Sequence, residues 1–172
     1  MIKLILYIVI LAGGIGVGYL AGRPFENRVI HLDDIILALK TLQAEMEYRG
    51  DPLPILLLRI GESTEGKAGE FLLRVLTLIE ENNDSDFYNR WKRAVDEVYT
   101  ETALKEDDRL ILSEAGIELG KTDIGNQQAL FAHTFRGLER QRKEANEEGK
   151  SRVKVYRTLG TASGVLAVIM LL

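Results

Sequence analysis

The amino-acid sequence predicts an all-α protein in which a charged helical middle lies between two apolar ends. Lys3 is the only charged residue before Arg23, and Arg157 is the last charged residue of the 172-residue chain. Between the ends, apolar residues recur every three or four positions, which is the period of a helix. We find no convincing stretch that alternates with a period of two, as a strand would. The chain-wide average of 46% hydrophobic and 28% charged residues hides this division.

The composition excludes several kinds of protein. The chain contains no cysteine, which rules out disulfides, thiolate metal sites and thiol catalysis. Its formal net charge of -4 is unlike that of a nucleic-acid-binding protein, which normally carries a basic face. We therefore expect no nucleic-acid partner.

The first apolar segment, Leu4 to Gly22, has nineteen residues without a charge. At about 1.5 Å per residue, such a helix covers the roughly 30 Å hydrocarbon core of a bilayer. The alternative is a cleaved signal peptide with Lys3 as its basic start. Tyr19 and Leu20 poorly match the small residues that precede a cleavage site. We therefore expect residues 1–22 to form a retained transmembrane helix.

The second apolar segment, Thr158 to Leu172, has fifteen uncharged residues, fewer than the usual ~20 of a membrane span. The residues before it extend its apolar stripe, and the long side chains of Lys154 and Arg157 can reach the headgroup level. The alternative is a helix buried in a soluble core. A modest domain would then have to cover a helix that is apolar on every face. We expect residues 153–172 to form a second transmembrane helix.

Basic residues near the two spans predict that the middle of the chain, residues 23–152, is cytoplasmic. Loops rich in lysine and arginine stay on the cytoplasmic side of a membrane. The outer flanks offer only Lys3, whereas six bases flank the spans on the inner side. These six bases are Arg23, Arg28, Lys150, Arg152, Lys154 and Arg157.

Both spans carry glycines at four-residue spacing, so the glycines of each span share one helix face. Small residues at this spacing let helix backbones approach closely in lipid. The alternative is that glycine is simply common in membrane helices. We expect helix packing in the membrane at Gly14, Gly18, Gly22, Gly160 and Gly164.

Amphipathic stripes predict several helices in the charged middle. Glycine and proline between Gly50 and Pro54 end the first helix, and Gly120 is expected to cap the fourth in a left-handed conformation. From Asp123 onward, interleaved charges favour one long solvated helix, rather than a linker, that leads into the second span. Three stripes lie at residues 32–46, 71–79 and 87–98, and a fourth helix is expected at residues 104–119.

Residues 61–68 match the spacing of a phosphate-binding loop except at the last position. Ala68 has no hydroxyl to hold a magnesium ion, and Glu62 and Glu65 would bring negative charge to a phosphate. We favour the alternative, a flexible glycine-rich loop between helices.

No other pattern indicates catalysis or metal binding. His31 and His133 are the only histidines, and neither has the companion four residues away that a helical metal pair requires. Adjacent acids such as Asp33 and Asp34 point in different directions on a helix. Trp91 lies within its stripe and is expected in the core. The sequence predicts no catalytic residue, no cofactor and no metal.

Short motifs in a fixed order then match a known family. They are Leu39 to Tyr48 followed by Pro52-Leu53, Thr102 to Lys105, Leu119-Gly120 with Asp123 and Gln127-Gln128, and Leu159-Gly160. Together with the two apolar ends, these motifs cover nearly the whole chain. In this pattern the sequence resembles the stage III sporulation protein AB family of endospore-forming bacteria.

The resemblance implies a membrane component of the channel complex that joins the mother cell to the forespore during engulfment. Such a protein would lie on the mother-cell side, in the outer forespore membrane. The resemblance also implies a non-catalytic bundle of about six helices, similar to the cytoplasmic domain of the F-family platform proteins of type II secretion and type IV pili. The implied function is to couple a cytoplasmic ATPase to a secretion-type assembly.

The same resemblance implies that the AA-type sporulation ATPase and other membrane components of the complex are partners. Membrane lipid and further copies of the chain complete the set of expected partners. Two alternative functions remain. One is a generic membrane-anchored helical adaptor unrelated to sporulation, and the other is a nucleotide-binding protein that uses residues 61–68.

Overall fold

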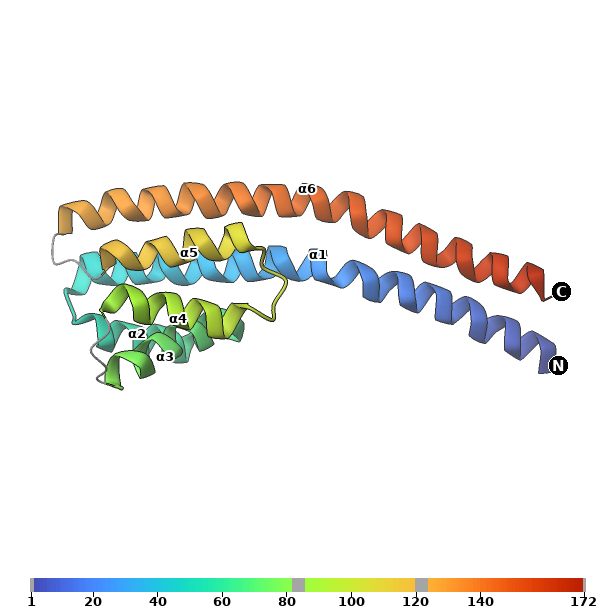
Figure 1. Ribbon diagram of the computed structural model, residues 1–172, viewed down its shortest axis with the longest axis horizontal. Helices are drawn as coiled ribbons and strands as arrows, with labels where there is room; N and C mark the ends of the chain where they lie inside the picture. The colour runs from blue at the N-terminus through green and yellow to red at the C-terminus, as the bar shows by residue number, and fades with distance from the viewer. Residues whose placement is uncertain (1, 82–85, 120–123, 172) are drawn as a thin grey trace. The chain divides into compact units, whose positions relative to one another are not determined.

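The computed structural model describes residues 2–81, 86–119 and 124–171, and within them the chain forms six α-helices and no strand (Figure 1). The predicted all-α class and the expected number of helices are confirmed. The helices are α1 (Ile2–Arg49), α2 (Leu53–Ser63), α3 (Gly66–Glu80), α4 (Phe87–Tyr99), α5 (Glu106–Leu119) and α6 (Ile124–Met170).

The chain divides into two compact units. We call one the bundle, which is Ile30–Lys143, and the other the terminal pair, which is Met1–Val29 with Glu144–Leu172. Helices α1 and α6 each contribute to both units. The domain limits predicted after residues 22 and 152 therefore fall inside continuous helices.

Glycine and proline separate α1 from α2, as the sequence predicts. Gly50 has a φ of +63°, a left-handed conformation that glycine adopts without steric cost. Pro52 stands directly before α2, and Pro54 lies in its first turn. The missing N–H of proline is not needed there for a helical hydrogen bond.

The connection between α2 and α3 is tighter than the loop that the sequence predicts. Helix α2 runs to Ser63, and α3 begins at Gly66, whose φ is +74°. A Cβ atom on Gly69 would lie 2.8 Å from the carbonyl oxygen of Gly61, so the two helix backbones are nearly in contact. The prediction of a flexible loop over residues 61–68 is wrong, because the glycines here allow close packing.

Side-chain hydrogen bonds fix the starts of α4 and α5. Asp86 accepts a hydrogen bond of 2.8 Å from the backbone N–H of Asn89, the usual arrangement at a helix N-terminus. Helix α5 begins at Glu106, later than the predicted stripe, because the buried carboxylate of Asp108 accepts the N–H of Lys105 at 2.9 Å. The predicted cap at Gly120 lies outside the described residues.

Trp91 is completely buried in the core of the bundle. Its Nε1 donates a hydrogen bond of 2.8 Å to the carbonyl oxygen of Leu112. Its ring meets the ring of Phe71 edge to face at a centroid distance of 4.8 Å, a favourable arrangement for aromatic pairs. The prediction that Trp91 belongs to the core is confirmed. The core also contains the buried side chains Leu32, Ile35, Leu39, Leu42, Leu56, Leu57, Leu72, Val75, Leu78, Ala94, Val95, Tyr99, Ala115, Phe131 and Leu138.

Substitution of Gly116 by alanine tests this packing. A Cβ atom at Gly116 would lie 2.5 Å from Cδ1 of Trp91, whereas the nearest atom to a Cβ at Gly149 is 3.7 Å away. Alanine favours a helix over glycine by about 1 kcal/mol, but overpacking a core costs about 1–3 kcal/mol. We expect Gly116→Ala to lower the melting temperature of the full-length protein in detergent, measured by circular dichroism, by a few degrees. Gly149→Ala should leave it unchanged or raise it, and equal effects would contradict the packing described here.

Candidate functional site

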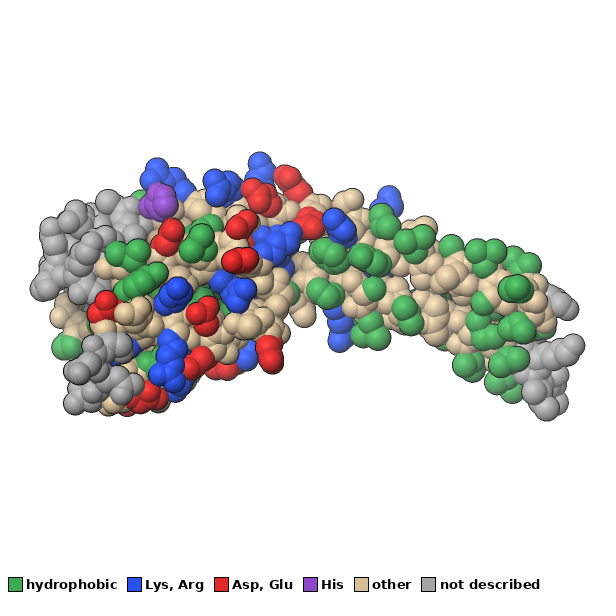
Figure 2. Space-filling model, in the orientation of Figure 1, with side chains coloured by type: hydrophobic (Ala, Val, Ile, Leu, Met, Phe, Trp, Pro, Cys, Tyr) green, Lys and Arg blue, Asp and Glu red, His purple; other side chains and the backbone are tan. Residues whose placement is uncertain are grey.

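The terminal pair exposes large apolar side chains along its length. Both long helices, over Ile5–Tyr48 and Phe131–Met170, are long and apolar enough to cross a membrane, and only 11% of the most apolar window of each is buried. A core helix of a soluble protein would be mostly buried, so this exposure argues against that alternative. Figure 2 shows hydrophobic side chains gathered over the uncharged segments. The exposed large apolar side chains of the terminal pair include Ile5, Leu6, Ile8, Val9, Ile15, Val17, Leu20, Leu159, Val165, Leu166 and Ile169.

Three glycines bring the backbones of α1 and α6 into direct contact. A Cβ atom on Gly14 would lie 2.7 Å from the carbonyl oxygen of Gly160, and one on Gly18 would lie 2.6 Å from that of Tyr156. From the opposite helix, a Cβ atom on Gly160 would lie 2.5 Å from the carbonyl oxygen of Gly14. These distances are far below van der Waals contact. Any larger residue at these three positions would force the helices apart.

The other two predicted glycines lie at the same helix contact with more room. A Cβ atom on Gly164 would be 3.4 Å from Leu11, and one on Gly22 would be 3.5 Å from the side chain of Val153. Both are close to ordinary van der Waals distances. Gly13, on another face of α1, has nothing within 4 Å of such an atom. That the five predicted glycines pack helices within lipid stays a prediction.

The contacts run antiparallel along the two helices. Near one end, the hydroxyl of Tyr7 donates a hydrogen bond of 3.2 Å to the carbonyl oxygen of Leu171. Next to it, α1 and α6 line an apolar groove of about 290 Å³. Near the other end, Gly22 lies against Val153.

Arginines and aromatic rings form a layer beyond the glycine contact. Arg28 is only 4% exposed and lies 3.5 Å from a carboxylate oxygen of Glu148, which also pairs with Arg152 at 3.4 Å. The guanidinium of Arg152 lies 5.7 Å from the ring centroid of Phe25, and this ring stacks on Tyr156 at 5.9 Å. Aromatic and basic side chains of this kind are typical of the membrane–water interface.

The residues that were considered as candidates for metal or phosphate binding do not form a site. His133 is exposed, and His31 is partly buried on α1. Among the described residues, no three His, Asp or Glu side chains lie together so that they could hold a metal ion. Residues 61–63 end α2 and residues 66–68 begin α3, so this segment lacks the preceding strand that a phosphate-binding loop requires.

Sequence reasoning missed a polar group inside the bundle. Within the described part of the chain, the hydroxyl of Tyr99 and Nδ1 of His31 are buried without a hydrogen-bond partner. Burial raises the pKa of Tyr99, and the negative charges of Asp34 and Glu70 act in the same direction. Burial lowers the pKa of His31, although Asp34 partly opposes this. The burial of these two atoms depends on tertiary packing, so no local sequence pattern indicates it.

Comparison with known proteins identifies the family. The model of the family described as stage III sporulation protein AB matches residues 3–172. The chain belongs to the stage III sporulation protein AB family. The resemblance seen in the short motifs is thereby confirmed, and membership in the stage III sporulation protein AB family supports a role in sporulation.

Individual relatives agree with this assignment. The stage III sporulation protein AB of Bacillus subtilis (strain 168) is 22% identical over 172 residues, which cover 100% of each chain. A solved structure of stage III sporulation protein AB has the same fold, with a TM-score of 0.65 and 21% identity. It covers 72% of this chain and 96% of its own.

Substitution of Gly160 by leucine tests the backbone contact. We expect Gly160→Leu to lower the melting temperature of the full-length protein in mild detergent by several degrees, because the new side chain collides with Gly14 and Gly18. Gly13→Leu adds the same side chain to a helix face with free space and should have little effect. Equal destabilisation by both variants would contradict a specific contact.

The buried position of His31 predicts a dependence of stability on pH. Its pKa is lowered in the folded protein, so below the unfolded value of about 6.5 the unfolded chain binds more protons. The stability that this group contributes is present above about pH 6.5 and is lost as the pH falls towards the folded pKa. We expect His31→Gln to reduce the fall in melting temperature between about pH 7.5 and pH 5.5. His133→Gln, at an exposed histidine, should leave that fall as in the wild type, and identical behaviour of both variants would rule out this role for His31.

Proposed function

We propose that the protein is a non-catalytic membrane platform in the channel complex between mother cell and forespore, where it couples a cytoplasmic ATPase to a secretion-type assembly. The observation that carries this proposal is the continuity of α1 and α6. Each helix contains an apolar segment of the terminal pair and a packed segment of the bundle. Because a helix is a stiff element, force applied to the bundle can reach the membrane spans without passing through a flexible linker.

The distribution of charge supports a cytoplasmic bundle. Four of the six basic residues that the sequence places on the cytoplasmic side of the spans contact acidic or aromatic side chains of the terminal pair. Arg28, Arg152 and Arg157 pair with Glu26 or Glu148, and Arg23 and Arg152 lie beside aromatic rings. The other two, Lys150 and Lys154, are exposed. Basic residues at this level of two membrane helices favour retention of the adjoining domain in the cytoplasm.

The polar surface of the bundle supports a structural role more than a catalytic one. Several ion pairs join different helices. Arg74 pairs with Glu97, and the amino group of Lys40 lies 2.9 Å from a carboxylate oxygen of Glu139. Hydrogen bonding to Glu97 raises the pKa of Arg74, and the same contact lowers the pKa of Glu97. Such pairs stay charged at neutral pH, whereas general acids and bases need pKa values near the working pH.

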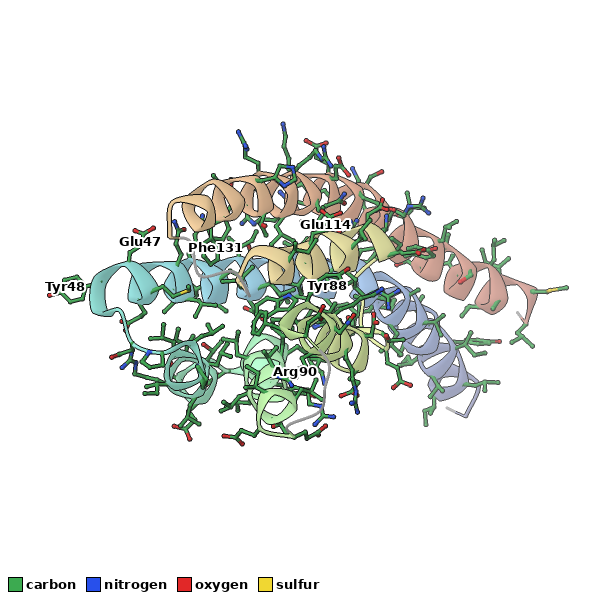
Figure 3. All side chains as sticks on the ribbon, turned by 60° about the vertical axis from the view of Figure 1, so that its left-hand side comes forward. Glu47, Tyr48, Tyr88, Arg90, Glu114 and Phe131 are labelled. Atoms are coloured by element: carbon green, nitrogen blue, oxygen red, sulfur yellow. The ribbon has the colours of Figure 1, made fainter. Side chains whose placement is uncertain are left out.

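An apolar stripe on α1 offers the bundle a surface for its partner. The exposed side chains Ile30, Leu37, Ala44 and Tyr48 lie at helical spacing on one face, with Leu37 66% and Tyr48 89% exposed. Tyr48 points away from the rest of the bundle (Figure 3). We propose that this stripe meets the ATPase.

Ion pairs border the stripe on both sides. Arg142 of α6 pairs with Asp33, and Arg59 of α2 lies 2.7 Å from Glu45. Protein interfaces commonly have an apolar centre and a polar rim of this kind. A partner that covers the stripe would bury apolar surface without leaving these charges unpaired.

Substitution of Leu37 by aspartate tests the proposal. A charge at the centre of an apolar interface should cost at least ~1.4 kcal/mol, which corresponds to about a tenfold loss of binding. We expect Leu37→Asp to reduce co-purification of the AA-type ATPase with the tagged full-length protein from sporulating cells by about tenfold. Leu110→Asp, at a similarly exposed leucine (56%) on α5, is the matched control and should bind as the wild type does.

The outcomes separate the competing functions. Equal binding by both variants would show that the stripe is not the contact surface. If the ATPase never co-purifies with the wild-type protein, the coupling function fails and the generic membrane adaptor is favoured.

A further inference from the structure

Two arginines converge on one tyrosine ring in the terminal pair. The guanidinium carbons of Arg23 on α1 and Arg157 on α6 each lie 5.3 Å from the ring centroid of Tyr19. An aromatic face attracts a cation, but two cations beside the same ring also repel each other. The arrangement is therefore stabilised further by any anion that lies between the two arginines.

The cluster carries more positive than negative charge. Glu26 accepts a hydrogen bond of 3.0 Å from Arg157, which balances one of the two arginines. Within the described part of the chain, Arg23 has no carboxylate partner, and its side chain is exposed. One positive charge thus stays uncompensated beside Tyr19.

A groove extends from the same arginine along α6. It has a volume of about 450 Å³ and is lined by Arg157, Thr158, Thr161 and Ala162. The hydroxyl of Thr161 donates to the carbonyl oxygen of Arg157 at 2.9 Å, so this polar group is already satisfied. The groove therefore has a cationic end and a floor of small uncharged side chains within the predicted second span.

We propose that Tyr19, Arg23, Arg157 and this groove bind one anionic phospholipid. Its phosphate lies between the two guanidinium groups, and one acyl chain lies along Thr158, Thr161 and Ala162. Both guanidinium groups lie beside the same ring, and a guanidinium group makes charge-assisted hydrogen bonds of about 2.8 Å to phosphate oxygens. Tyr19 stands near the end of its apolar segment, where headgroup phosphates lie.

The shape and charge of the site favour a lipid over its competitors. A free phosphate ion would match the arginines but would leave the groove uncovered. A span from a second copy would fill the groove but would bring no negative charge to Arg23. The proposal rests on the membrane position of the spans, as the proposed function does, and it is independent of the ATPase.

Native mass spectrometry of the full-length protein in detergent tests the proposal. Phosphatidylglycerol and phosphatidylcholine with the same acyl chains are added in equal amounts. We expect the wild type to retain phosphatidylglycerol with about a tenfold preference, which is ~1.4 kcal/mol. Arg23→Gln with Arg157→Gln should lose that preference. Lys150→Gln with Lys154→Gln removes the same charge from exposed positions on α6 outside the cluster and should keep it.

A second variant tests the groove separately from the charge. Ala162→Phe fills the groove, keeps both arginines and should also reduce retention of phosphatidylglycerol about tenfold. Glycerol phosphate, which has the phosphate but no acyl chain, should fail to displace the lipid at equal concentration.

Several results would overturn the proposal. If the lysine double variant loses the preference for phosphatidylglycerol as much as the arginine double variant does, the attraction is a diffuse electrostatic one. If glycerol phosphate displaces the lipid, the arginines form a site for a free anion. A wild-type dimer that Ala162→Phe dissociates would identify a second copy as the occupant. A protein that does not enter membranes at all would contradict both this proposal and the proposed function, whereas insertion without lipid preference contradicts this proposal alone.

Discussion

The contact between the backbones of the first and last helices constrains the rest of the structure. Gly14 and Gly18 of α1 meet Gly160 of α6 at distances that no larger residue permits. Because the contacts run antiparallel, the chain enters and leaves the terminal pair at the same end. This contact therefore fixes the register of the two apolar segments of the terminal pair.

The periodicity of apolar residues was sufficient to predict most of the bundle. The stripe around Trp91 identified a core helix, and the absence of period two excluded a sheet. The short helix α2 was harder to predict, because prolines at its start and Gly61 near its end resemble a loop when only the sequence is considered. Gly61 and Gly69 in fact allow α2 and α3 to approach closely. This distinction depends on a neighbouring helix that no local pattern reveals.

The candidate site could be predicted only in outline. Glycine spacing placed five residues on the facing sides of two helices, but the register of the helices decides which three lack room for a side chain. Tyr19 entered the sequence argument only as a poor signal-peptide residue. Its role became visible when Arg157, far away in the chain, was found beside it. The unpartnered polar atoms of His31 and Tyr99 escaped prediction because their burial depends on tertiary packing.

We propose that two paired spans hold the bundle on the cytoplasmic side of a membrane. The most direct measurement is the labelling of a cysteine that replaces Glu65, an exposed residue between α2 and α3, in a chain that has no other cysteine. The account predicts that this cysteine resists a membrane-impermeant maleimide in intact cells and reacts after permeabilisation. Full labelling in intact cells would place the bundle outside and would contradict the account.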